Sequence, residues 1–203
     1  MERAFKRRTA LRGAAVLAAG TAVPVGAADA ASDEFTELTW RASGPGISPQ
    51  PFRTRVVSGI PAVAGYGTSV TFGPVIVQAI SDKSFPLLLR TTGYSSLSAT
   101  VTGTVVVTDS RGLSGRLPVM IVFPRVTMPA TAVETVFTGT ATLTGSPQLP
   151  AVRNPGTIKI EAETGFQGAV KVFKDNGTSA SFTSTITLVP VNQNPAVATI
   201  EVR

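Results

Sequence analysis

The stretch Leu97-Ser-Ala-Thr-Val-Thr-Gly-Thr-Val-Val-Val-Thr108 is rich in Thr and Val and carries no helical stripe of apolar residues. A second stretch of the same kind is Ala132-Val-Glu-Thr-Val-Phe-Thr-Gly-Thr-Ala-Thr-Leu-Thr144. β-Branched side chains are stiff at χ1 and pack well on a pleated surface, so both stretches predict long strands. Each contains Thr-Gly-Thr, with the glycine at 103 or 139, and a glycine inside a strand usually marks a bulge or a close approach to the backbone.

Shorter runs with a period of two surround these stretches. Gly and Pro separate them (19 and 15 residues in the chain), and Asn176-Gly177 indicates a tight hairpin between two of them. This pattern is typical of an antiparallel sandwich or barrel. No stretch after residue 31 fits a helix template. We therefore expect an all-β, immunoglobulin-like antiparallel β-sandwich, as one large or two small sandwiches. The shorter strands are expected at 35–40, 52–57, 69–72, 75–80, 87–92, 117–123, 157–162, 169–173, 179–188 and 197–202.

Prolines interrupt the pattern near the middle of the chain, at Pro124 and Pro129. They indicate a boundary near residue 128. The units are then 32–128 and 129–203, the second being either a separate β-sandwich or a continuation of the first.

Residues 1–31 resemble an export signal. Basic residues precede an apolar run that is too short to span a bilayer, and small residues follow at 27–31, as at a cleavage site. The pair Arg7-Arg8 leaves the twin-arginine route open. We expect a secreted protein, associated with the cell wall or free, with no membrane span in the mature chain.

The charge of the chain depends strongly on this leader. The formal net charge is +6, and removing the five basic and two acidic residues of 1–31 leaves +3. No basic stripe interleaved with aromatic residues follows, so the sequence does not indicate nucleic-acid binding. The chain also has no Cys and no His, which excludes disulfides, thiolate ligands and imidazole catalysis.

Several turn and strand-end pieces resemble a group of secreted actinobacterial β-sandwich proteins of unassigned function. They are Leu38–Pro51, Gly59-Ile60-Pro61, Leu143-Thr-Gly145 with Leu149-Pro150, Asn154–Ile160 and Ala198–Val202. The resemblance implies a β-sandwich and an extracellular setting but no chemistry. Members of this group often carry two cysteines, at places that correspond here to Ala42 and to Ile186 or Thr187.

Five residues are candidates for ligand binding. Arg41, Arg53 and Arg55 lie near Trp40 and Phe52 and suggest a small cationic patch that meets an anionic wall polymer. Stems of Arg that shield a sheet face are the alternative. Tyr66 and Tyr94 each lie beside glycine in expected loops, where aromatic rings stack on sugars. Trp40 ends a strand and is expected in the core.

Closely spaced carboxylates are few. Glu161 and Glu163 share one face of an expected strand with Lys159, which favours a solvated face over a cation site or a glycosidase pair. We expect no catalytic residue, no metal and no cofactor.

These observations favour an exported, non-enzymatic structural or adhesive surface module that contacts an extracellular protein, with self-association left open. The alternative is a small module that binds cell-wall or extracellular polysaccharide through Tyr66, Tyr94 and the nearby arginines.

Overall fold

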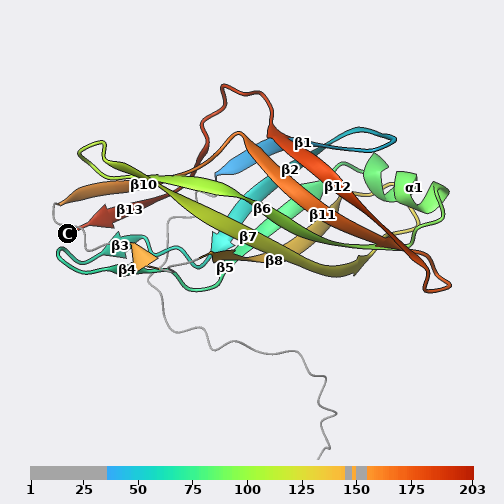
Figure 1. The fold of residues 1–203 in the computed structure, drawn as a ribbon, viewed down its shortest axis with the longest axis horizontal. Coiled ribbons are helices and arrows are strands. Elements are labelled where there is room, and N and C mark those ends of the chain that lie inside the picture. The colour runs from blue at the N-terminus through green and yellow to red at the C-terminus, as the bar shows by residue number, and fades with distance from the viewer. Residues whose placement is uncertain (1–35, 145–147, 150–154) are drawn as a thin grey trace, which may run out of the picture.

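The computed structural model describes residues 36–144, 148–149 and 155–203, so the expected leader lies outside the described part. This part is all-β, with one short helix (Figure 1). The strands are β1 (Glu37–Gly44), β2 (Ile47–Ser58), β3 (Val63–Ala64), β4 (Val70–Thr71), β5 (Val75–Ser81), β6 (Ser96–Thr108), β7 (Ser114–Thr127), β8 (Thr135–Leu143), β9 (Gln148–Leu149), β10 (Gly156–Ala162), β11 (Gly165–Phe173), β12 (Ser179–Leu188) and β13 (Ala196–Val202). The helix is α1 (Ser84–Thr91).

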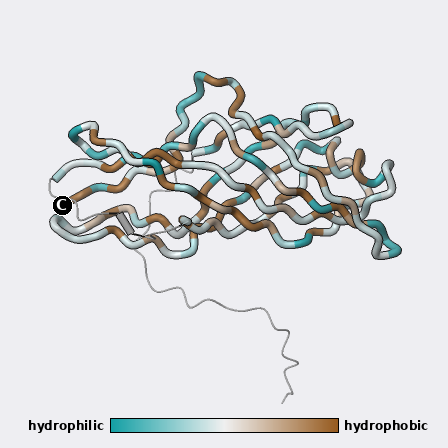
Figure 2. The backbone as a smooth tube through the Cα atoms, in the orientation of Figure 1, coloured by the Kyte–Doolittle hydropathy of each residue, from teal (hydrophilic) through white to brown (hydrophobic). Residues whose placement is uncertain are grey.

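Eight antiparallel strands close into a barrel. Their order is β11-β12-β1-β2-β5-β8-β7-β6, and β6 then pairs with β11 to complete the circle. Hydrophobic and hydrophilic residues alternate along these strands (Figure 2), which places one row of side chains inside and the other outside. In β8, for example, Thr135, Phe137, Gly139 and Ala141 are buried, while the residues that alternate with them are exposed.

The expected immunoglobulin-like sandwich is therefore wrong. Most of the expected strands lie nearly where the sequence placed them, but the pairing of β6 with β11 joins the two edges that a sandwich would leave apart. Bulges interrupt the registers of β1–β2, β2–β5 and β6–β7, and bulges bend strands enough to help a sheet close.

The two units expected on either side of residue 128 contribute to the same sheet. β8 follows the expected boundary in sequence, but it lies between β5 and β7, which precede it. The boundary thus falls between two neighbouring strands of one barrel.

The second correction concerns residues 87–92, which were expected as a strand. Most of this segment belongs to α1, which carries a proline in its first turn, where proline costs no backbone hydrogen bond. Asp82 Oδ1 accepts the N–H of Ser84 at 2.8 Å, and Gly93, with φ of +85°, follows the end of the helix. An apolar face of only two turns does not stand out from a strand in the sequence.

Opposite α1, the barrel flares (Figure 1). The first half of β6 pairs with β11, whereas its second half, Val105–Thr108, pairs with β10. β10 also pairs with β13, and β13 with β3 in parallel. β10 and β11 run along the same edge of β6 and are separated by Glu163 and Thr164, so the wall divides at this point.

A glutamine side chain contacts β1 just beyond Trp40, the last residue of β1 that pairs with β12 in this direction. Gln193, in the loop between β12 and β13, accepts the N–H of Thr39 at 3.0 Å and donates to the Thr39 carbonyl at 2.7 Å. The amide thereby replaces one residue of a neighbouring strand along β1.

The core has two parts. The larger one fills the barrel between α1 and the middle of the strands, and it includes Leu38, Met128 and Leu188. The smaller one lies between β10, β13 and the segment before β5, around Ile158 and Ile200. The space between these two clusters contains the candidate site.

Candidate functional site

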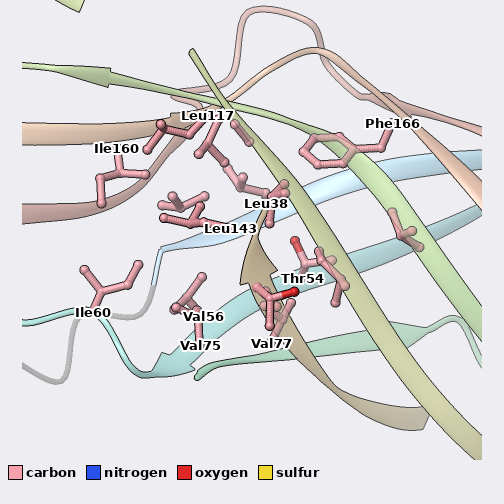
Figure 3. A pocket seen from close by; sticks show the side chains of 18 of the residues that line it. Leu38, Thr54, Val56, Ile60, Val75, Val77, Leu117, Leu143, Ile160 and Phe166 are labelled. Atoms are coloured by element: carbon pink, nitrogen blue, oxygen red, sulfur yellow. The ribbon is translucent and has the colours of Figure 1, made fainter. Parts of the chain in front are cut away.

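A cavity of about 480 Å³ lies inside the flared end of the barrel (Figure 3). Both core clusters contribute to its wall, together with the segment that joins β2 to β5. Its lining residues are almost all aliphatic or aromatic. Those labelled in Figure 3 are Leu38, Thr54, Val56, Ile60, Val75, Val77, Leu117, Leu143, Ile160 and Phe166.

No Lys, Arg, Asp or Glu lines this cavity among the residues that the structure describes. Two threonines do. Thr142 is an exposed residue on β8, and its hydroxyl donates to the Met120 carbonyl at 3.4 Å. Thr54 is half-buried, and its Oγ1 accepts a hydrogen bond of 2.8 Å from Trp40 Nε1. The Trp40–Thr54 pair is thus the main polar feature of the wall.

Two strand glycines allow aromatic rings to lie close to the backbone of the wall. A Cβ on Gly103 would overlap the ring of Phe166, and a Cβ on Gly139 would lie 2.7 Å from Phe123 Cδ1. Phe166 also meets Trp40 edge to face, with ring centroids 5.3 Å apart. Because the rings rest on bare backbone, they occupy less of the lumen than they would over a side chain. The Thr-Gly-Thr segments thus mark close approaches, as the sequence suggested.

The mouth of the cavity lies between the start of β5 and the end of β8. Val75 pairs with Ala141, and this register, continued by one residue, places Pro74 opposite Thr142. Pro74, Gly73 and Thr142 line the cavity and are also exposed. Access from solvent is therefore at the flared end.

The other end of the barrel is closed by packing. Leu89 of α1 is buried, and Phe85 meets Phe137 edge to face at 6.4 Å. The guanidinium of Arg90 donates twice to the carbonyl of Met128, whose side chain is fully buried. These contacts fix α1 over this end of the core, so packed side chains close this end of the barrel.

The three candidate arginines all lie on the outside of the barrel, whereas Trp40 and Phe52 face the inside. Arg53 forms ion pairs with Glu37 at 3.0 Å and with Glu134 at 2.9 Å, and its hydrogen bond to Glu37 raises the pKa of Arg53. Arg55 donates to Gln78 at 2.8 Å. Arg41 is exposed on β1. The structure thus separates the expected cationic group from the aromatic residues near it in sequence.

The two candidate tyrosines lie toward opposite ends of the molecule. The N–H of Tyr66 donates to the carbonyl of Arg203, beside β3 and β13, and the side chain is exposed. The N–H of Tyr94 donates to the carbonyl of Leu89 in α1, and Lys174 Nζ lies 5.6 Å from its ring centroid. One sugar ring does not reach both (Figure 1). That either tyrosine binds a ligand stays a prediction.

Other sequence expectations fall near the cavity. Trp40 is buried, as expected, with 5% of its surface exposed, but it also lines the cavity. Glu161 lies on the face of β10 away from the buried Ile158 and Ile160, whereas Glu163 follows the end of β10 and forms an ion pair with Arg116 at 2.8 Å. Within the described residues, no group of three or more acidic side chains is arranged to hold a metal.

Sequence reasoning missed the cavity. Its wall is made from the same inward-facing Val, Leu, Ile and Phe residues that would fill a solid core, so composition does not reveal it. The one local signal was the glycine inside each Thr-Gly-Thr segment, which indicated a close approach without saying what approached.

The fold and the cavity define a small antiparallel β-barrel whose apolar interior is accessible from the flared end. No family model matches the sequence, and neither a curated protein nor a solved structure matches the chain. The resemblance to a group of secreted proteins stays a prediction. Ala42 and Ile186, at the places where members of that group often carry two cysteines, are directly opposite each other in β1 and β12. In the described residues no helix is long and apolar enough to cross a membrane.

Proposed function

We propose that this protein binds one small apolar molecule inside its barrel and carries it. The observation that supports this proposal is the cavity of about 480 Å³, which is within the size range of small-molecule sites. An eight-stranded barrel is just wide enough either to be filled by side chains or to hold one small ligand.

The cost of such a cavity supports the same proposal. Protein interiors are close-packed, and an unfilled volume lowers stability because its lining loses dispersion contacts. Here the chain keeps Gly103 and Gly139 beneath two phenylalanine rings, which enlarges the lumen. A ligand would restore the missing contacts, and its binding would raise the free energy of unfolding.

Binding is measured with a neutral fluorescent probe, N-phenyl-1-naphthylamine. We expect its emission to rise with saturation at one probe per chain. Trp40 is the only tryptophan of the chain and lines the cavity, so its emission should change in parallel.

Two neighbouring residues of β7 provide a matched pair of variants. Ile121 lines the cavity, whereas Val122 is exposed on the outer face. Ile121→Phe should weaken probe binding by about tenfold or more, because overfilling costs about 1–3 kcal/mol. Val122→Phe should leave it unchanged. Equal affinities for the two variants would refute the proposal.

We further propose, from the leader-like sequence of residues 1–31, that the protein acts outside the cytoplasm, free or associated with the wall. The earlier expectation of a surface module that contacts proteins or polysaccharide stays a prediction. Fractionation addresses both: recovery from the medium fits a diffusible carrier, salt-extractable recovery from the wall fits a surface module, and retention at full length in the cytoplasm contradicts export.

A further inference from the structure

The chemistry of the cavity wall restricts the ligand further, provided that the proposed binding function holds. An indole has one N–H and no acceptor, so the hydrogen bond to Thr54 Oγ1 satisfies Trp40 completely. A threonine hydroxyl both accepts and donates. Among the hydrogen bonds of the described residues, Thr54 accepts from Trp40 and its own hydrogen has no acceptor.

The position of Thr54 makes this hydrogen available to a ligand. Its side chain lies in the cavity lining with Leu38, Val56 and Val77 (Figure 3), and none of these neighbours offers a side-chain acceptor. In β2, Thr54 pairs with Leu38 on one side and Ala79 on the other. The hydrogen bond from Trp40 also orients the Thr54 hydroxyl, because the side that accepts from the indole cannot carry the hydroxyl hydrogen.

Among the described residues, no cationic side chain lines the cavity. The nearest in sequence are Arg53 and Arg55, which flank Thr54 but point to the outer face, where they contact Glu37, Glu134 and Gln78. A carboxylate inside would therefore be buried without a partner, which is far more costly than burying a neutral oxygen.

We propose that the cavity takes a neutral, mainly hydrocarbon molecule with one oxygen acceptor, such as a ketone or ester carbonyl, which receives the hydrogen of Thr54. The hydrocarbon part fills the apolar lumen. The oxygen lies at the Trp40–Thr54 pair. Ionised fatty acids are rejected because no described residue of the wall carries a charge that would neutralise them.

The first test compares three probes of equal chain length: nonane, nonan-2-one and nonanoate. Each displaces N-phenyl-1-naphthylamine from the wild-type protein. At pH 7 nonanoate should bind at least about tenfold more weakly than nonan-2-one, and its affinity should rise as pH falls below about 5 and the acid becomes neutral. Tighter binding of nonanoate than of the ketone at pH 7 would overturn the proposal.

The second test isolates the Thr54 hydroxyl. Trp40→Phe keeps this hydroxyl, and the double variant Trp40→Phe/Thr54→Val removes it without leaving an unpaired indole N–H. The double variant should bind nonan-2-one about 2–10-fold more weakly than Trp40→Phe does, because it lacks one neutral hydrogen bond. The two variants should bind nonane with the same affinity. Equal changes for ketone and alkane would overturn the assignment.

Thr142→Val is the matched control, since Thr142 also lines the cavity but gives its hydroxyl to Met120. This variant should leave the ratio of the affinities for nonan-2-one and nonane unchanged. If the double variant does not fold, the infrared band of carbonyl-labelled nonan-2-one bound to the wild type decides: a shift below its frequency in hexane supports the hydrogen bond, and no shift overturns it. Failure of every probe, the fluorescent one included, would instead refute the binding function itself.

Discussion

The two ends of the barrel are built from similar strands, but one is filled and the other is hollow. At the α1 end, Leu89 of the helix, Met128 and Phe137 are buried in the larger core cluster. At the flared end, Leu117 of β7 and Leu143 of β8 instead face the cavity. The difference begins where β6 changes its partner from β11 to β10. A sheet can therefore close into a barrel without its interior being fully packed, and in this protein side chains fill only the α1 end.

A matched pair of leucine truncations tests this contrast with the largest expected effect. Leu89→Ala removes a side chain from the packed end and should cost about 2–5 kcal/mol of unfolding free energy. Leu117→Ala removes one that already faces a cavity and lies half-buried, so it should cost clearly less. Denaturant unfolding measures both, and equal losses would contradict the contrast.

The second test concerns the close approach beneath Phe166. Gly103→Ala adds a methyl group where the ring lies and should cost about 1–3 kcal/mol, as overpacking does. The displaced ring would also narrow the cavity and weaken probe binding. Gly115→Ala in β7 is the control, because nothing lies within 4 Å of its added Cβ.

A compensating variant tests whether the stability lost in Gly103→Ala comes from the Phe166 ring. Phe166→Leu in the Gly103→Ala background should recover part of the lost stability in a double-mutant cycle, since the smaller side chain leaves room for the methyl group. Additive losses would show that Phe166 is not what Gly103 accommodates.

The third test concerns the two hydrogen bonds between Gln193 and β1. Gln193→Ala removes both hydrogen bonds to Thr39 and should lower the unfolding free energy by about 1 kcal/mol. Hydrogen exchange at the Thr39 amide should accelerate. Gln50→Ala removes only a local bond to Ser48 and should change neither quantity. An unchanged Thr39 amide in Gln193→Ala would show that the side chain does not hold the strand.

The smallest effect is expected at the start of α1. The hydrogen bond from the Ser84 N–H lowers the pKa of Asp82, so this carboxylate stabilises the fold above its unfolded pKa. Asp82→Ala should slightly lower the melting temperature at pH 7. The gap between variant and wild type should close as pH falls through the lowered pKa. A gap that persists in strong acid would assign the effect to another cause.

Much of the secondary structure was predictable from sequence. The expected strand at 75–80 matches β5, and the Asn176-Gly177 turn joins β11 to β12, with Gly177 at φ of +84°. α1 was missed because its apolar positions span only two turns. The cavity was missed because its wall uses ordinary core residues. Two of the five candidate site residues, Tyr66 and Tyr94, were grouped because each lies beside glycine in an expected loop, although the fold places them toward opposite ends.

The sequence by itself determined most of the segments that are strands and which face of these strands is apolar, but not α1. These properties are local, because the two-residue period follows from the geometry of successive Cβ atoms. Only the tertiary structure decided that the sheet closes and that its interior stays partly open. Closure depends on β6 pairing with β11, and Thr102 and Gln167, which are partners there, lie far apart along the chain. An inward apolar row satisfies a sandwich and a barrel equally well, so no local pattern records which of them forms.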